Sequence, residues 1–137
     1  MPDIIVKYAT GDQYDLSVRG HRLRVDQPVE DGGDDTAPTP TELFVSSLAA
    51  CVAFYAGRYL SRHGLPKEGL RAEADYRFAR RPARVGEILL RLHVPEGVPD
   101  EHLAPLLAVA SHCTVHNTLQ LPPSVEIELV TARRAAA

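Results

Sequence analysis

The sequence predicts an α+β fold in which the elements follow the order β-β-β-α-β-β-α-β around one long central helix. Two regions alternate apolar and polar residues, which is the period of a half-buried strand. Between them lies a long segment that has apolar residues at helical spacing and clear start and stop signals. The chain has 137 residues, a length that suits one domain with one core.

The first third of the chain predicts three strands followed by a loop. Residues 3–9 and 14–28 both alternate, and the second region turns at Gly20, which indicates a hairpin with its charged residues facing outwards. The apolar positions of this hairpin are Leu16, Val18, Leu23 and Val25. Residues 29–38 are acidic and Gly-rich, so they predict a loop, which is either a solvated connector or a mobile lid.

The predicted central helix covers residues 39–64. Thr39 is the expected N-cap, Pro40 suits the first helical position, and Glu42 completes a capping box. Gly64 is the expected stop signal. The helix carries an apolar stripe made of Phe44, Leu48, Cys51, Tyr55 and Tyr59. Because the helix is apolar over most of its surface and one small domain has little material to cover it, we expect a tight homodimer.

The second half of the chain predicts a hairpin, a helix and a closing strand. Residues 70–78 and 87–94 alternate strictly on either side of a turn, which indicates a long antiparallel hairpin with one buried face. Residues 99–112 predict a helix in which Pro105 causes a kink or shifts the start. Residues 114–119 predict a further short helical turn, residues 124–131 a strand, and residues 132–137 a frayed tail.

Composition excludes several classes of protein. The net charge of −3 argues against a nucleic-acid binder. No apolar run approaches the roughly 20 residues of a membrane span, and the N-terminus has no basic region of the kind that begins a signal peptide. Two cysteines do not make a disulfide framework of the secreted kind. We therefore expect a reducing cytoplasm, where a cysteine pair is more often catalytic, redox-active or metal-bound than structural.

Cys51 and Cys113 are the two thiols of the chain. Either residue, taken alone, is explained as a small buried apolar side chain. Cys51 lies in the middle of the predicted helix, away from the termini where the helix dipole acts. Cys113 lies at the start of the short helical turn, where backbone amides favour a thiolate. Spacing alone leaves open whether the two sulfur atoms meet.

The segment PTPTELFVSSLAACVAFYA, followed later by ASHCTVHNTL, resembles the OsmC/Ohr-like family of osmotically inducible and organic hydroperoxide resistance proteins. The resemblance covers nearly the whole chain, because the order of elements also agrees. It implies an intertwined α+β homodimer with two sites at the subunit interface. It also implies that Cys51 is the peroxidatic cysteine, which becomes a sulfenic acid, and that Cys113 is the resolving cysteine, whose disulfide with Cys51 an external dithiol reduces.

The helper residues that usually assist the family's peroxidases do not match this chain. The family places a glutamate ten positions before the peroxidatic cysteine, where this chain has Thr41, and an arginine in the turn after the first strand, which here lacks one. Glu42 lies roughly on the opposite side of the helix from Cys51 and fits the capping box better. Arg58 is a candidate substitute cation or a solvated or interface arginine. The chain therefore resembles the broader OsmC-like branch.

Two functions from different classes are compatible with these residues. The first is a thiol-dependent peroxidase for organic hydroperoxides, in which Phe44, Leu48 and Tyr55 form a pocket for an alkyl tail. The second is a non-enzymatic dimer that binds an apolar small molecule or senses oxidants, which the unmatched helper residues favour.

A metal site is a third possibility. Its ligands would be Cys113, His112, His116 and Cys51, but this spacing is not that of a recognised zinc site, and a structural site needs four ligands. We therefore expect neither a metal nor another cofactor.

Overall fold

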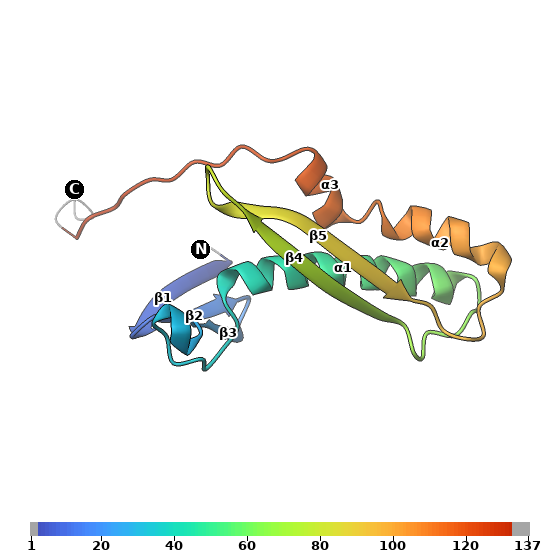
Figure 1. The fold of residues 1–137 in the computed structure, drawn as a ribbon, viewed down its shortest axis with the longest axis horizontal. Coiled ribbons are helices and arrows are strands. Elements are labelled where there is room, and N and C mark those ends of the chain that lie inside the picture. Colours follow the sequence, from blue (N-terminus) through green and yellow to red (C-terminus); the bar gives the residue numbers. More distant parts are fainter. Residues whose placement is uncertain (1–2, 133–137) are drawn as a thin grey trace.

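The structure, a computed structural model, describes residues 3–132 of the chain (Figure 1). The first elements are β1 (Ile4–Thr10), β2 (Gln13–Val18), β3 (His21–Val25) and the 3₁₀ turn η1 (Val29–Asp31). The long helix α1 (Pro40–Arg62) follows. The chain continues through β4 (Arg71–Ala79), β5 (Arg84–His93), the 3₁₀ turn η2 (Asp100–His102), α2 (Leu103–Ala110) and α3 (Thr114–Gln120). The predicted α+β class and the central helix are confirmed.

The first three strands form an antiparallel sheet in the order β1-β2-β3. Leu16 lies opposite Leu23, as the predicted hairpin requires. The chain turns at Arg19 and Gly20, which both have positive φ angles, as a two-residue hairpin turn demands. Every side chain of β1 is exposed in the single chain. The sheet lies beside the start of α1 (Figure 1), and it has an apolar face formed by alternate residues of its strands.

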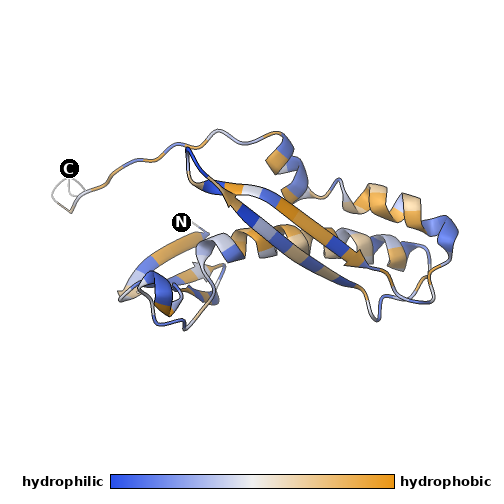
Figure 2. Cartoon of the chain, viewed as in Figure 1, coloured by the Kyte–Doolittle hydropathy of each residue, from blue (hydrophilic) through white to orange (hydrophobic). Residues whose placement is uncertain are grey.

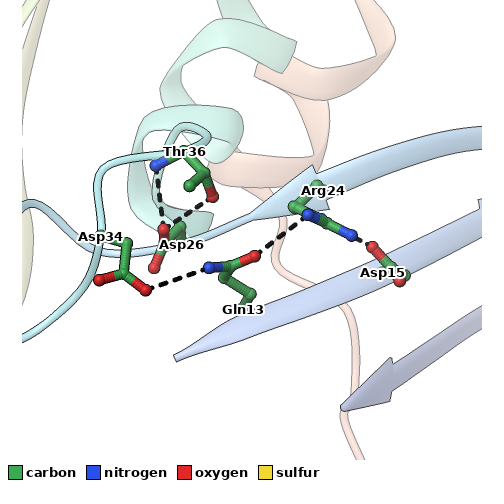
Figure 3. Close-up of polar contacts among 6 residues, drawn as sticks. All are labelled: Gln13, Asp15, Arg24, Asp26, Asp34 and Thr36. Carbon is green, nitrogen blue, oxygen red and sulfur yellow. Dashed lines mark hydrogen bonds and ion pairs between the residues drawn. The ribbon is translucent and has the colours of Figure 1, made fainter. Parts of the chain in front are cut away.

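The loop after β3 is fastened to the sheet by Asp26, which is fully buried. Its carboxylate accepts hydrogen bonds from the Thr36 amide (2.9 Å), the Thr36 hydroxyl (2.8 Å) and the Gln27 amide (2.7 Å). These hydrogen bonds lower the pKa of Asp26, and the bond from the Thr36 amide has the largest effect. Figure 3 shows the adjoining network of Gln13, Asp15, Arg24 and Asp34. This anchoring favours the connector interpretation of residues 29–38 over the mobile lid.

The ends of α1 are fixed by the local signals that the sequence contains. The Thr39 side chain accepts a hydrogen bond from the Glu42 amide (3.0 Å), and the Glu42 carboxylate accepts one from the Thr39 amide (2.8 Å). The predicted capping box is thus confirmed, with Pro40 as first helical residue. The helix ends at Arg62, and Gly64 adopts a positive φ angle two residues later.

The core lies where α1 meets α2, α3 and the β4–β5 hairpin. The hairpin pairs Ala74 with Leu90 and Tyr76 with Ile88, which confirms the predicted antiparallel hairpin. The buried cluster consists of Leu48, Val52, Ala56, Tyr59, Leu60, Val98, Leu106, Ala110 and Cys113. Pro105 is the third residue of α2, where the amide that proline lacks has no helical partner. Of the two expected effects of Pro105, the shifted helix start is therefore the one observed.

Helix α1 is long and apolar enough to cross a membrane by length and composition, with a mean hydropathy of 1.4 over its most apolar window. The length of this apolar helix differs from the expectation that no apolar run in the chain approaches the length of a membrane span. The helix packs along the other helices and the β4–β5 hairpin (Figure 1), and the central helix of a globular core meets the same criteria.

The strand predicted at residues 124–131 is not formed, so this prediction is wrong for the single chain: residues 122–131 are neither helix nor strand. They run away from α3 as an extended segment (Figure 1). Their apolar residues are almost fully exposed, including Ile127 at 86% and Leu129 at 93%, and Figure 2 shows them as isolated apolar positions along the segment. A strand needs a hydrogen-bonded neighbour, which alternation in the sequence does not supply. The frayed tail predicted from residue 132 lies almost wholly outside the described residues.

Candidate active site

The two thiols come from different elements that meet in the core. Cys51 is in the middle of α1, is half-buried, and packs against the buried cluster of which Cys113 is a member. Cys113 is fully buried, at the entrance to α3. Both are free thiols. The structure therefore places the more accessible sulfur on the long helix and the buried sulfur beside it.

Cys113 is the N-cap of α3, because its Sγ accepts a hydrogen bond from the His116 amide at 3.4 Å. Cys113 therefore lies at a helix start, as predicted. The backbone amide there was expected to favour the thiolate, but burial has the larger and opposite effect. Burial raises the pKa of the Cys113 thiol, the bond from the His116 amide opposes this, and a hydrogen bond and charge interaction with Cys51 raise the pKa further. Desolvation disfavours the thiolate more than one weak amide bond favours it. Cys51 packs against the same buried cluster that contains Cys113.

A pair of hydroxyl groups joins the same two elements beside the thiols. Tyr55 Oη and Thr114 Oγ1 are 2.7 Å apart. Tyr55 follows Cys51 by one helical turn on α1, and Thr114 directly follows Cys113. The sequence pattern placed Tyr55 on the same stripe as Cys51 but gave no indication of its bond to Thr114, because hydroxyl partners distant in the sequence leave no periodic signal.

The three residues expected to form an alkyl pocket do not share one environment. Leu48 is part of the buried core, and Tyr55 reaches Thr114. Phe44 is exposed and lines an open hollow of about 380 Å³ whose other lining residues are Pro40, Thr41, Arg84 and Val85. Two larger hollows, of about 710 and 680 Å³, lie on β4–β5 and on β1–β3, and neither cysteine lines them.

The two candidate charged helpers have partners other than the thiols. Glu42 is exposed and held in the capping box at the start of α1. The guanidinium of Arg58, also exposed, stacks 4.8 Å above the centre of the Phe54 ring. Each side chain therefore has a structural partner of its own: the backbone for Glu42, and an aromatic face for Arg58.

The imidazole rings of the histidines next to Cys113 bond to groups other than the thiols. His112 Nδ1 lies 2.7 Å from the Ala108 carbonyl oxygen, and His116 Nε2 lies 3.3 Å from the Gln120 amide nitrogen. Within residues 3–132, no group of three or more histidine, cysteine, aspartate or glutamate side chains is arranged as metal ligands are.

Comparison with known proteins identifies the family. Residues 32–128 match the family model described as OsmC-like protein. The chain therefore belongs to the OsmC-like family. A comparison with curated proteins finds no match.

Solved structures share the fold over most of the chain. A Psychrobacter arcticus protein named for an osmotic stress induced and detoxification response has a TM-score of 0.79 at 23% identity, covering 86% of this chain and 88% of its own. An organic hydroperoxide resistance protein OsmC from Legionella pneumophila gives 0.66 at 21%, covering 85% and 88%. A Vibrio cholerae protein named for organic hydroperoxide resistance, with captopril in one of its active sites, gives 0.64 at 20%, covering 88% and 85%. At these identities the likeness establishes the fold.

Proposed function

We propose that the protein is a thiol-dependent peroxidase that reduces organic hydroperoxides through Cys51 and Cys113. The observation that carries this proposal is the placement of two free thiols of different accessibility in one core, because the half-buried Cys51 packs against the buried cluster that contains Cys113. Membership of the OsmC-like family and the names of two structural neighbours, which refer to organic hydroperoxide resistance, support the same chemistry.

The exposure of each thiol suggests its role. The half-buried Cys51 can meet a peroxide, and its thiolate attacks the terminal peroxide oxygen. The O–O bond breaks, the alkoxide takes up a proton and leaves as an alcohol, and Cys51 becomes a sulfenic acid. The sulfur of Cys113 then attacks the Cys51 sulfur. The S–O bond breaks, water leaves, and a disulfide remains, which an external dithiol reduces by exchange.

Thiol titration before and after one equivalent of cumene hydroperoxide tests this proposal. We expect two thiols per chain to disappear with no change in oligomer size, because the disulfide forms within one chain. The same protein is expected to recover both thiols on addition of a dithiol. Retention of both thiols after peroxide treatment would refute the peroxidase.

A second candidate function is a non-enzymatic dimer that binds an apolar small molecule or senses oxidants. The observation in its favour is that both candidate charged helpers have other partners, since Glu42 bonds to the Thr39 amide and Arg58 stacks on Phe54. Binding of a fatty or aromatic ligand that persists when both cysteines are replaced is the result that distinguishes this function from the enzyme.

Disulfide formation is expected to accelerate as the pH rises above neutrality. The pKa of Cys113 is raised, chiefly by burial and further by Cys51, and the thiolate is the species that attacks sulfenic sulfur. Below that pKa the rate should rise about tenfold per pH unit, with sulfenic acid accumulating at lower pH. Trapping of the sulfenic acid with dimedone at a series of pH values measures this. A Cys113→Ser control should show no pH-dependent loss of the trapped species, and a disulfide rate that does not vary with pH would contradict the prediction.

We also infer that the protein works as a homodimer in a reducing cytoplasm. The apolar face of the first sheet is exposed to solvent in the single chain, with Ile4 and Tyr8 each 64% exposed. The apolar residues Val125, Ile127 and Leu129, which alternate with Glu126 and Glu128, are exposed as well. Large uncovered apolar surfaces are unfavourable in water, and a second copy would cover both surfaces reciprocally.

The paired substitution Ile127→Asp with Leu129→Asp is expected to shift the protein from dimer to monomer. Two carboxylates on the apolar side of the segment would each need to be desolvated in the interface. Light scattering after gel filtration measures the change. The matched control, Glu126→Lys with Glu128→Lys, alters the polar side of the same segment and should leave the dimer intact. A wild-type protein that is monomeric at micromolar concentration would contradict the homodimer.

A further inference from the structure

Helix α1 holds the segment that contains Cys113 through two tyrosine hydroxyls one turn apart. Tyr55 Oη lies 2.7 Å from Thr114 Oγ1 at the start of α3, and Tyr59 Oη lies 2.8 Å from His102 Nδ1 at the end of η2. Both tyrosine rings pack in or against the buried cluster. The two bonds therefore fasten the segment from η2 to α3 at both ends, but only the first of them is adjacent to a cysteine.

We propose that the hydroxyl pair of Tyr55 and Thr114 is a positioning device that sets the approach of Cys113 to Cys51 and so controls formation of their disulfide. This inference rests on the proposed function only in taking the two cysteines as a disulfide-forming pair. Tyr55 and Thr114 touch no reacting atom; they act through the two elements that carry the sulfur atoms.

The argument begins with geometry. The hydroxyl bond joins the residue one turn beyond Cys51 on α1 to the residue directly after Cys113. The hydroxyl bond therefore links α1 to the start of α3, which are the two elements that the disulfide would also link, at a neighbouring position. Cys113 is held on its other side by the amide of His116. The hydroxyl bond restrains the start of α3 relative to α1, and the His116 amide restrains the Cys113 side chain, before any oxidation occurs.

The energetic argument is one of preorganisation. A disulfide needs the two Cα atoms about 4.4–6.8 Å apart and the Cβ atoms turned towards one another. Without the hydroxyl bond, the start of α3 can sample a wider range of separations from α1, and closing the disulfide then has to restrict that range. A bond that is already made in the reduced protein removes this cost, which raises the effective concentration of one thiol at the other.

Side-chain chemistry supports this role for Tyr55. The tyrosine ring has only two side-chain torsions, so it reaches across to α3 at little entropic cost. Its ring also meets the Phe54 ring edge-on at a centroid distance of 5.8 Å. Thr114 is the first residue of α3 and Cys113 is its N-cap, so a restraint on the Thr114 side chain also restrains the start of that helix.

The test is the thiol–disulfide equilibrium of the whole protein with mixtures of oxidised and reduced dithiothreitol, read by alkylation and mass spectrometry. This measurement does not depend on peroxide. Tyr55→Phe and Thr114→Val each remove one hydroxyl while keeping the shape of the side chain. We expect each to lower the equilibrium constant for the intramolecular disulfide by roughly two- to tenfold, the range that the loss of one hydrogen bond covers. The double variant should lose no more than either single one, because both remove the same interaction.

Two controls separate positioning from a general loosening of the structure. Thr114→Ser keeps the hydroxyl and should restore the wild-type equilibrium. Tyr59→Phe is the same chemical change one turn along α1, and it removes the bond to His102. It should lower stability in urea without changing the disulfide equilibrium.

The outcomes also distinguish this inference from the proposed function. A wild-type protein that forms a disulfide, together with Tyr55→Phe and Thr114→Val proteins of unchanged equilibrium, would overturn the positioning role alone. An equal loss in Tyr59→Phe would overturn it as well, because the effect would then be general. A wild-type protein that forms no intramolecular disulfide at any ratio of the reagents would overturn the cysteine pair, and with it both proposals.

Discussion

Cys51→Ser is expected to reduce peroxide consumption to the uncatalysed rate of the dithiol alone. Cys51 is the half-buried thiol and Cys113 is fully buried, so no second accessible thiol is available to meet the peroxide. A serine hydroxyl has nearly the same size but is far less acidic and a poor nucleophile towards peroxide oxygen. Loss of dithiol in a coupled assay with cumene hydroperoxide measures the effect.

Cys113→Ser is the matched variant, and its expected behaviour is different. The peroxide still reaches Cys51, so one equivalent is consumed in a first turnover and a sulfenic acid accumulates. Steady turnover then depends on direct reduction of that sulfenic acid by the external dithiol and should be slower. Full steady-state activity in Cys51→Ser would refute the assignment of Cys51 as the attacking residue, and a Cys113→Ser protein with no first turnover would refute the assignment of Cys113 as the resolving residue.

The parts of the fold that depend on neighbours in sequence could be predicted from the sequence. Thr39, Pro40 and Glu42 define the start of α1 because a capping box involves only a few consecutive residues. The two hairpins could be predicted for a similar reason, since alternation fixes which side chains share a face and a short turn fixes the register.

The site could be predicted only in part. The positions of Cys51 and Cys113 in their elements follow from local patterns, but the packing of Cys51 against the cluster that contains Cys113 depends on how α3 returns to α1, which no spacing encodes. The pKa of Cys113 shows the same limit. Its place at a helix start was predictable, whereas the burial that outweighs the amide bond depends on packing by distant residues. The buried anchor at Asp26 was missed because its main partner, Thr36, lies across a loop with no periodic pattern.

The prediction at residues 124–131 failed for an instructive reason. The alternation of apolar residues and glutamates correctly describes a chain with one side suited to burial. It does not say which molecule supplies the neighbouring strand. The apolar side chains of this segment are exposed in the single chain, and in the proposed homodimer a second copy would cover them, which is why the Asp substitutions at Ile127 and Leu129 test the dimer directly.

Gly33→Ala is expected to destabilise the protein by about 2–4 kcal/mol, through overpacking against the backbone. A Cβ at this position would lie 2.1 Å from the Gln27 carbonyl oxygen, 2.6 Å from the carbonyl carbon and 2.7 Å from Asp26 Oδ1. Two of these atoms belong to the backbone, and the third is a carboxylate oxygen that the Gln27 amide already holds. None of them can move without opening the loop that Asp26 fastens to β3.

Gly57→Ala is the matched control, because it adds the same methyl group to another glycine. Gly57 lies in the interior of α1 and is buried, yet a Cβ there would meet only Leu70 Cδ2 and Lys67 Cδ, both at 3.6 Å, which is ordinary contact. Alanine is a better helix former than glycine, so this variant should gain about 0.5–1 kcal/mol. Urea denaturation of both variants and the wild type at one protein concentration compares them. Equal stability of the two variants would contradict the steric argument, since it predicts opposite signs for one and the same chemical change.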